Sequence, residues 1–482
     1  MKLYELRRRL TVVAALRGKL SPANANETSQ ANPVFYCKMK GLSCLLLFAC
    51  VSFCLASDTE VRYVHLALTG NTTEMSVGWY TEDASKSTVR WGDKPGDYPF
   101  SAVGTSSEWH NDYGYNHFAT IINLRPNTRY YYVCGDASGG WSREFSFKSA
   151  PVKGIYGDMG TENSQKTIDR VSAKMQNGEI DWIYHVGDIS YADKHYFNFQ
   201  KTWNSWFNSI QSISASAPYM VCPGNHEYEA YNPFIMLQSR NFVVYNARFR
   251  MPQSANSSHQ NMYYSFDYGP VHFLSISTET SFDGAPFDDD HKFADQVAWV
   301  TEDLRVANLP ENRKQRPWIF VIGHRPMYSS CDEYSSKGVP TSKSSVAIQK
   351  SFEDLFNKFK VDVLFNGHVH SYERNYPAYK NKRTGTSYVN PKNPFNIITG
   401  CAGVSHRNQR DMSSCEQSLE GLKNEHETKW DLPQPEWSAH RYGSDYGYGI
   451  LTVTNGTHLD WKFYRVSDDG LEDSVVVQKS FV

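Results

Sequence analysis

Apolar residues recur along the chain in two different patterns, and the change falls near residue 150. Between about 58 and 150 they alternate with polar residues in short runs, as at Met75, Val77 and Trp79, and turn residues separate the runs. An alternation with a period of two indicates strands that bury one face. The sequence therefore predicts an all-β domain over residues 58–150.

The stretch LRPNTRYYYVCG, residues 124–135, carries the same alternation through a loop into a strand. It resembles the strand-loop-strand signature of a fibronectin type III β-sandwich. No cluster of histidines or carboxylates appears in this region. We therefore expect residues 58–150 to form a packing module.

From about 151 to 482, continuous apolar runs alternate with helix-like stretches. The runs lie near 152–156, 182–186, 219–222, 271–276, 318–322, 361–365 and 395–398, and the helical stretches at 165–175, 292–306 and 346–359. Alternating strands and helices predict a layered α/β domain. Two later runs, 450–453 and 459–463, have no helix between them, which favours antiparallel strands and an α+β arrangement at the C-terminal end.

The first 56 residues predict export. Residues 39–56 read as a Met, a Lys, an apolar run and small residues around Ala56, which is typical of a secretory signal peptide. Because signal peptides begin a chain, we interpret Met39 as the true start and 1–38 as a doubtful extension. The alternative is a signal anchor held by the basic residues Arg7, Arg8 and Arg9. No other apolar stretch approaches membrane-spanning length, so no stable span is expected after cleavage.

Sequence features after the leader also favour a secreted protein. Such a protein would be extracellular or would lie in the lumen of the secretory or lysosomal pathway. Glycosylation sequons occur at Asn71, Asn256 and Asn455. Five cysteines follow the leader, and Cys401 and Cys415 are close enough in sequence to close a short loop. Without the eight basic and two acidic residues of 1–56, the chain has 41 basic and 49 acidic residues, a net charge of −8. This charge gives no case for nucleic-acid binding.

Polar residues follow five of the apolar runs, at the point where each strand should end. They are Asp158, Asp188 with Tyr191, Asn225 with His226, His324, and His368 with His370. Each of these residues, taken alone, is explained as a helix cap, a turn former or a polar side chain at the surface. Because ligands of open α/β sheets bind at the carboxyl ends of strands, five such places in chain order favour a metal site over turn chemistry.

Five blocks resemble the motifs of the purple acid phosphatases, which belong to the calcineurin-like metallophosphoesterases. The blocks are Asp158-x-Gly160, Gly187-Asp188-x-x-Tyr191, Gly224-Asn225-His226-Glu227, Val321-x-x-His324 and Gly367-His368-x-His370. The resemblance covers roughly residues 58–470, and the N-terminal sandwich fits the larger, plant-type members. It implies a metallophosphoesterase sandwich behind a fibronectin III-like domain.

The resemblance also implies a binuclear centre. Fe(III) takes Asp158, Tyr191 and His370, a second ion (Zn, Mn or Fe(II)) takes Asn225, His324 and His368, and Asp188 bridges them. Generic metallophosphoesterases carry a His where this chain has Gly160, and the Tyr191 phenolate replaces that ligand. A metal-bound hydroxide would attack phosphorus, and His226, outside the ligand set, would stabilise charge or protonate the leaving group.

One departure concerns the loop after the fourth block. Plant-type members usually carry a further histidine there, but residues 327–338 contain none. Arg325 is either a phosphate contact or a structural residue.

The implied function is a secreted acid phosphatase acting on small phosphate monoesters. The alternatives are a phosphodiesterase or nucleotide pyrophosphatase on the same site, and a catalytically weak cell-surface binding protein. The sequence is silent on oligomeric state.

Overall fold

The computed structural model describes residues 57–108, 113–148, 153–195, 197–228, 241–253, 257–287, 292–331, 338–404 and 433–480. The expected leader 39–56, the extension 1–38, Asn256 and Cys415 lie outside these ranges. Within them, no helix has the length and apolar character needed to cross a membrane.

The N-terminal strands form two antiparallel sheets. One has the order β1 (Arg62–Ala67), β2 (Met75–Thr81), β6 (Tyr115–Ile121), β5 (Thr105–Ser107). The other has the order β4 (Phe100–Val103), β3 (Thr88–Gly92), β7 (Arg129–Asp136), β8 (Gly140–Trp141), with β9 (Phe145–Lys148) also on β7. The alternating residues Met75, Val77 and Trp79 pack with Tyr130 and Tyr132 in one core, which confirms the predicted all-β domain.

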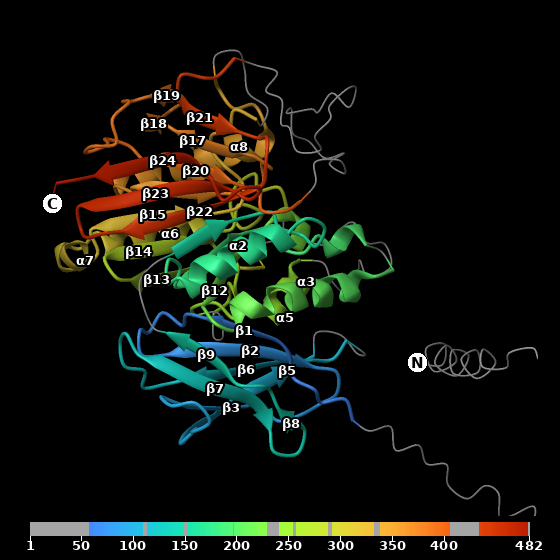
Figure 1. Ribbon diagram of the computed structural model, residues 1–482. Coiled ribbons are helices and arrows are strands. Elements are labelled where there is room, and N and C mark those ends of the chain that lie inside the picture. Colours follow the sequence, from blue (N-terminus) through green and yellow to red (C-terminus); the bar gives the residue numbers. More distant parts are fainter. Residues whose placement is uncertain are drawn as a thin grey trace, which may run out of the picture. The chain divides into compact units, whose positions relative to one another are not determined.

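The second region contains two mixed sheets (Figure 1). The first has the order β12 (Tyr219–Cys222), β11 (Trp182–Val186), β10 (Lys153–Tyr156), β22 (Gly447–Val453), β23 (His458–Arg465), β24 (Leu471–Gln478). The strands β10, β11 and β12 are parallel, whereas β22, β23 and β24 add to them antiparallel, as the C-terminal runs predicted.

The second sheet has the order β13 (Tyr264–Tyr268), β14 (Val271–Ser275), β15 (Trp318–Ile322), β16 (Val363–Asn366), β20 (Phe395–Thr399), β17 (Tyr372–Asn375), β21 (Ser438–Tyr442). Its strands β14, β15, β16 and β20 are parallel. A separate hairpin joins β18 (Ala378–Tyr379) and β19 (Lys382–Arg383).

Aromatic side chains join the two mixed sheets face to face. The ring centroids of Trp182 and Phe273 lie 5.2 Å apart, and those of Phe365 and Trp461 also lie 5.2 Å apart. Strands that are covered on both faces bury every residue, which is why their sequences read as unbroken apolar runs.

Helices cover the outer faces of this sandwich. Residues of α2 (Gln165–Gln176) and α3 (Phe199–Ser214) pack in the core of the first sheet, and the two helices lie side by side (Figure 1). Residues of α6 (Gln296–Ala307), α8 (Lys343–Ile348) and α9 (Asp354–Lys358) pack with β15 and β16. The shorter helices are α5 (Val243–Arg248) and α7 (Pro310–Gln315).

Two predicted helices have revised bounds. The stretch expected from 292 begins at Gln296, because the Asp295 side chain accepts a hydrogen bond from the Ala298 amide and caps the helix there. The stretch expected at 346–359 starts at Lys343 and passes through a π-helical turn, Gln349–Glu353.

Hydrogen bonds join the N-terminal sandwich to α3. The Tyr132 hydroxyl donates to the Ala215 carbonyl at 2.8 Å, and the Ser214 hydroxyl donates to the Val64 carbonyl at 3.1 Å. The Val64 amide donates to the Gln211 side chain at 2.8 Å. These bonds fix the end of α3 against the sandwich.

The cysteines differ from the sequence expectation in one respect. Cys401 is a buried free thiol, so the expected loop closure with Cys415 is wrong. Cys134 and Cys222 are also buried free thiols, whereas Cys331 is disulfide-bonded. Short separation along the chain does not by itself bring two Cβ atoms into bonding geometry.

A partly buried histidine, His272 of β14, lies between two carboxylates near the edge of the second sheet. Its Nδ1 is 2.8 Å from Asp267 and its Nε2 is 2.8 Å from Asp303. Burial opposes protonation, but the two carboxylates outweigh it and raise the pKa of His272 to about 9.

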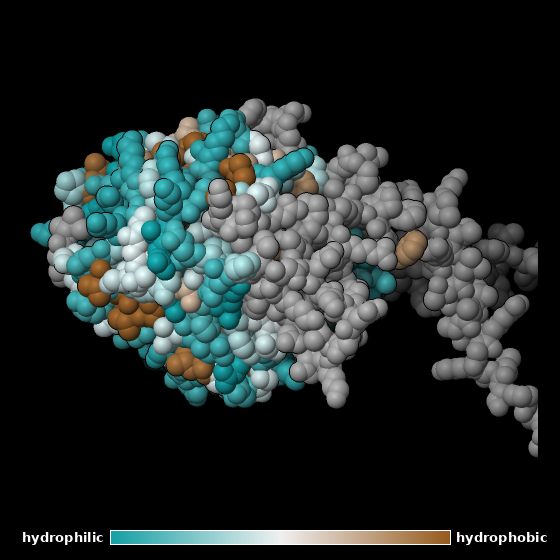
Figure 2. All heavy atoms as spheres, turned by 90° about the horizontal axis from the view of Figure 1, so that it is seen from above, coloured by the Kyte–Doolittle hydropathy of each residue, from teal (hydrophilic) through white to brown (hydrophobic). Residues whose placement is uncertain are grey.

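The described residues on the face of the molecule shown in Figure 2 are mostly hydrophilic, with apolar side chains in small scattered groups.

Candidate metal centre

Seven polar side chains converge at the carboxyl ends of parallel strands from both mixed sheets. The first sheet supplies Asp158 after β10, Asp188 and Tyr191 after β11, and Asn225 after β12. The second supplies His324 after β15, and His368 and His370 after β16. The structure thus brings together all seven residues that the sequence analysis proposed as ligands.

One half of the cluster contains Asp158, Asp188, Tyr191 and His370. A ligand atom from each of Asp158, Asp188 and His370 lies within 4.8 Å of the others. The Tyr191 hydroxyl is 3.3 Å from Asp158 Oδ1, 3.3 Å from Asp188 Oδ2 and 3.0 Å from His370 Nε2. Four buried donors therefore face one small volume.

The other half contains Asp188, Asn225, His324 and His368. Ligand atoms of Asp188, His324 and His368 also lie within 4.8 Å of one another. His324 Nε2 is 3.2 Å from Asp188 Oδ2 and 3.2 Å from Asn225 Oδ1. Asp188 belongs to both halves, so its carboxylate is placed to bridge two cations.

Two observations test whether a cation fits this half. His324 Nδ1 donates to the Val186 carbonyl at 2.8 Å, so in a neutral ring the Nε2 lone pair points at Asp188. His368 Nδ1 is buried and has no hydrogen-bond partner among the described residues. Electron-rich atoms that converge without a proton between them suit a metal ion, and the donor set fits.

The pKa shifts of the cluster residues also favour a bound cation among the seven donors. Burial opposes protonation of His324, but the charges of Asp188 and Asp158 outweigh it and raise its pKa to about 10. Burial raises the pKa of Asp158 well above its usual value, and the neighbouring charge of Asp188 adds to this effect. The cluster therefore favours a positive charge, which a proton or a metal ion supplies.

The backbone aims these side chains through unusual dihedral angles. The φ angles are 57° at Asp158, 50° at Asp188, 56° at Tyr191 and 69° at His368. Non-glycine residues adopt this left-handed region at a cost of ~1–3 kcal/mol each, and such residues gather at functional sites. Four of the seven donors thus have strained backbone conformations in the segments that follow strands.

Two glycines make room for the donors. A Cβ on Gly160 would lie 2.9 Å from Val404 Cγ2 and 3.4 Å from the Tyr191 ring, and the φ of Gly160 is 59°. A Cβ on Gly224 would lie 2.3 Å from Asp188 Oδ1. The Tyr191 ring thus packs next to the position where generic metallophosphoesterases carry a histidine.

His226 lies beside the cluster. Its Nδ1 is 2.7 Å from Asp193 Oδ2, and its Nε2 is 3.9 Å from Asp188 Oδ2. Its ring lies on that of Tyr191, with centroids 4.1 Å apart. Burial lowers the pKa of His226, but the charges of Asp193 and Asp188 outweigh this effect and raise it. The imidazole is therefore held with one nitrogen toward the cluster, and its carboxylate neighbours favour the protonated form.

Three comparisons with known proteins agree with this geometry. The family model described as the purple acid phosphatase N-terminal domain matches residues 61–149. The calcineurin-like phosphoesterase model matches 106–372, and the iron/zinc purple acid phosphatase-like protein C model matches 393–474.

Curated relatives match over most of their length. Acid phosphatase type 7 of Danio rerio is 35% identical over 437 residues, which cover 85% of this chain and 89% of that protein. Its counterpart in Homo sapiens is 35% identical over 451 residues, covering 89% and 92%. Probable purple acid phosphatase 20 of Arabidopsis thaliana is 33% identical over 422 residues, covering 84% of each. The chain belongs to the purple acid phosphatase family.

This assignment confirms the resemblance read from the five motifs, and it makes the chain an acid phosphatase. A solved purple acid phosphatase from yellow lupin seeds has the same fold, with a TM-score of 0.69 at 22% identity over 88% of this chain and 75% of that one. Purple acid phosphatases are metal-dependent binuclear enzymes. The two groups that share Asp188 are the candidate metal-binding groups of this family member.

The sequence analysis missed three carboxylates around the purple acid phosphatase motifs. Glu227 is buried and accepts hydrogen bonds from the amides of Asp188, Ile189 and Gly224 at 2.9, 2.7 and 2.9 Å. Asp193 orients His226, and Glu279 binds Arg325. Glu227 and Asp193 lie within or beside the motif blocks, which is a usable signal, whereas Glu279 has no motif to mark it.

The guanidinium of Arg325 binds two side chains of the protein, Glu279 and His368. Its Nε donates to Glu279 at 3.0 and 2.9 Å, and its Nη1 donates to His368 Nε2 at 2.9 Å. These contacts give Arg325 a structural role, which is one of the two readings from sequence. Because Arg325 donates to Nε2, Nδ1 is the nitrogen of His368 that has no hydrogen-bond partner among the described residues.

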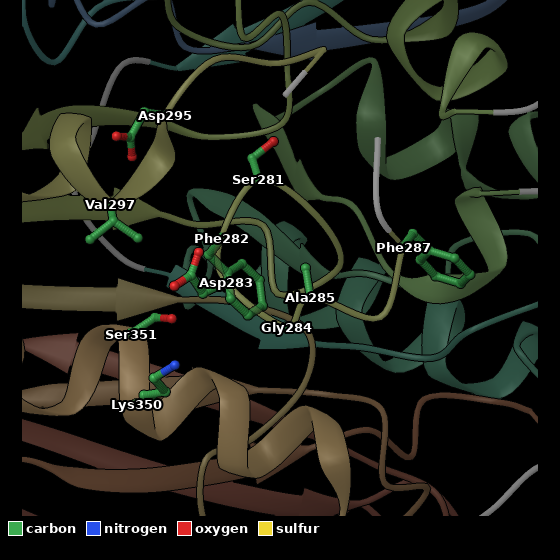
Figure 3. A pocket seen from close by; sticks show the side chains of 10 residues that line it. All are labelled: Ser281, Phe282, Asp283, Gly284, Ala285, Phe287, Asp295, Val297, Lys350 and Ser351. Atoms are coloured by element: carbon green, nitrogen blue, oxygen red, sulfur yellow. The ribbon is translucent and has the colours of Figure 1, made fainter. Parts of the chain in front are cut away.

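A cavity of about 570 Å³ is lined by the loop 281–287, the start of α6 and the π-helical turn Gln349–Glu353 (Figure 3). Phe287 in its wall stacks on Tyr228, with ring centroids 4.0 Å apart, and Tyr228 directly follows Glu227. None of the seven donors is among the described residues that line it: Ser281, Phe282, Asp283, Gly284, Ala285, Phe287, Asp295, Val297, Lys350 and Ser351. The cavity is thus a neighbour of the centre and separate from it.

Proposed function

We propose that this family member is a secreted acid phosphatase that hydrolyses small phosphate monoesters at a binuclear Fe(III)–M(II) centre, with Zn, Mn or Fe(II) as M. The observation that carries the proposal is the shared carboxylate of Asp188, which belongs to two donor groups at once. A phenol in one group and an amide with two imidazoles in the other suit a ferric and a divalent ion respectively.

In this proposal Asp158, Tyr191 and His370 would hold Fe(III), and Asn225, His324 and His368 would hold the second ion. The carboxylate of Asp188 would serve both. When bound, the pair of ions supplies Lewis-acid polarisation of the phosphoryl oxygens and activates water as the nucleophile.

His226 is the proposed proton donor. The Asp193 carboxylate accepts the Nδ1 proton at 2.7 Å, which fixes the ring and leaves Nε2–H directed toward the cluster. A proton at Nε2 neutralises the oxygen of a departing alkoxide as the bond to phosphorus breaks. The Tyr191 ring lies against it, with centroids 4.1 Å apart and planes at 37°, and limits its rotation.

Three features support secretion. Residues 39–56 carry the signal-like pattern, and the side chains of Asn71 and Asn455 are both exposed, as an attached glycan requires. Cys331 is disulfide-bonded, which suits an oxidising compartment.

The deciding experiment combines colour, metal content and substrate. The secreted protein should contain about one iron per chain and show a visible tyrosinate-to-Fe(III) absorption band, and Tyr191→Phe should abolish that band. Tyr245→Phe, which removes another buried phenol, is the matched control and should keep it. A coloured Tyr191→Phe protein would refute the iron assignment. Turnover of bis(p-nitrophenyl) phosphate in preference to p-nitrophenyl phosphate would instead assign the phosphodiesterase alternative.

A further inference from the structure

A small cavity lies between the N-terminal sandwich and the second region. It measures about 210 Å³, which is smaller than the roughly 300–1,000 Å³ of sites for drug-sized ligands and suits an occupant the size of one sugar ring. The sandwich contributes the β1–β2 loop, Leu124 and Pro126 to its walls, and the second region contributes Pro218 and the β13–β14 hairpin. An occupant of this cavity therefore contacts both domains.

The sequon residue Asn71 lines this cavity and is exposed on the β1–β2 loop. The amide and the hydroxyl of Thr73 donate to Asn71 Oδ1 at 3.1 and 3.0 Å, which turns that oxygen back into its own loop. Asn71 Nδ2 donates to Glu74 Oε1 at 2.9 Å, and Glu74 lines the same cavity. The nitrogen that would carry a glycan is therefore on the cavity side of the loop.

The walls of the cavity suit a sugar. Phe266 and Tyr268 of β13 line it, and Tyr268 packs on Trp182 with ring centroids 5.7 Å apart while it remains partly exposed. A pyranose presents C–H groups on its faces, which pack on aromatic side chains, and hydroxyls at its edge, which need polar neighbours. The exposed Lys148 and the half-buried Asp181 also line the cavity and supply polar groups.

A second cavity, of about 500 Å³, continues from the first, since Lys148 and Asp181 line both. Its other walls carry hydrophilic side chains such as Arg129, Ser172 and Gln176. The sugars that follow the first one in a glycan would thus meet polar groups.

We propose that the first sugar of an N-linked glycan on Asn71 occupies the smaller cavity and holds the sandwich against the second region. In the transfer, Nδ2 bonds to the anomeric carbon of a lipid-diphosphate-linked sugar, and the lipid diphosphate leaves as one amide proton is released. The remaining proton on Nδ2 can still donate to Glu74. Because attachment keeps the sugar beside the cavity, the weak contacts of one ring suffice. This inference rests on the proposed secretion.

Thermal melts of the secreted protein test the contact. Thr73→Ala removes the sequon and should lower Tm on the order of 2 °C, whereas Thr73→Ser keeps the sequon and should keep Tm. Endoglycosidase trimming of the wild-type glycan to its first sugar should also keep Tm. Thr457→Ala removes the same kind of hydroxyl contact, but its Asn455 does not line the cavity, so its loss of Tm should be smaller.

A double-mutant cycle isolates the sugar from the loop. Tyr268→Leu should lower Tm more in the glycosylated protein than in the Thr73→Ala background. Equal lowering in both backgrounds, a loss of Tm on trimming to one sugar, or an unmodified Asn71 in the peptide mass spectrum of the secreted protein would overturn the inference. Turnover of p-nitrophenyl phosphate should be equal in the wild-type protein and Thr73→Ala. Its absence from metal-loaded wild-type protein would refute the proposed phosphatase activity and leave the glycan contact standing.

Discussion

Removing the imidazole of His226 should slow the enzyme in a way that depends on the leaving group. The ring is 7% exposed, its Nδ1 is fixed by Asp193 at 2.7 Å, and its Nε2 faces the cluster. General acids contribute ~10²–10⁴-fold, which corresponds to about 2.7–5.4 kcal/mol of transition-state stabilisation. His226→Ala should lower kcat by this factor for an alkyl phosphate such as glycerol 2-phosphate. The loss should be much smaller for p-nitrophenyl phosphate, whose leaving group is stable as an anion.

Asp193→Asn should give a smaller loss with the same selectivity. It replaces a charge-assisted hydrogen bond by a neutral one, a difference of about 1–1.5 kcal/mol, or roughly ten-fold. Steady-state kinetics with both esters and metal analysis of each variant form the assay. Equal losses for the two esters would show that His226 positions substrate, and lost metal in His226→Ala would make it a ligand. Either result refutes the role of proton donor.

Three further perturbations test other parts of the structure. Gly224→Ala should lower metal content and reduce activity at least ten-fold, because its Cβ would lie 2.3 Å from Asp188 Oδ1; normal metal content would contradict this crowding. His272, with its pKa raised to about 9 against about 6.5 when unfolded, stabilises the fold fully below pH 6.5 and loses this contribution as pH rises through 9. Thermal melts from pH 6 to 9.5 should therefore fall more steeply for the wild-type protein than for His272→Asn, by on the order of 2 kcal/mol, whereas parallel curves would exclude the role. A chain that begins at Met39 should be secreted as efficiently as the full sequence with a mature N-terminus near residue 57, and a loss of export would favour the signal anchor.

The strands of the sandwich could be predicted because each is buried on both faces. Trp182–Val186 and Trp318–Ile322 have the bounds expected from their apolar runs. Helix α3 was missed although Trp203, Trp206 and Ile210 lie on one face, because the Asn and Ser residues between them lower the helix propensity of the segment. Its burial in the core, which only folding supplies, stabilises it.

Residue types at the centre were predictable, but several of their partners were not. Asp158 and His370 follow strands and stand in motif blocks, so their convergence follows from a parallel sheet. The pairing of Glu279 with Arg325 joins positions 46 residues apart on different loops, and no local pattern encodes it. The expected pairing of Cys401 with Cys415 was wrong for the same reason. The course of the loops in the folded protein, and not separation along the chain, decides which thiols meet.

The bonds between the N-terminal sandwich and α3 have a consequence for the order in which the chain is made. Tyr132 leaves the ribosome 83 residues ahead of Ala215, which accepts its hydroxyl proton. At ~5–20 residues per second this gap lasts roughly 4–17 s, longer than a small β-domain needs to fold. The sandwich can therefore complete its own core while the polar groups and apolar surface meant for α3 still face solvent. If the proposed secretion holds, this surface is where a chaperone of the secretory pathway would bind until the helix is made.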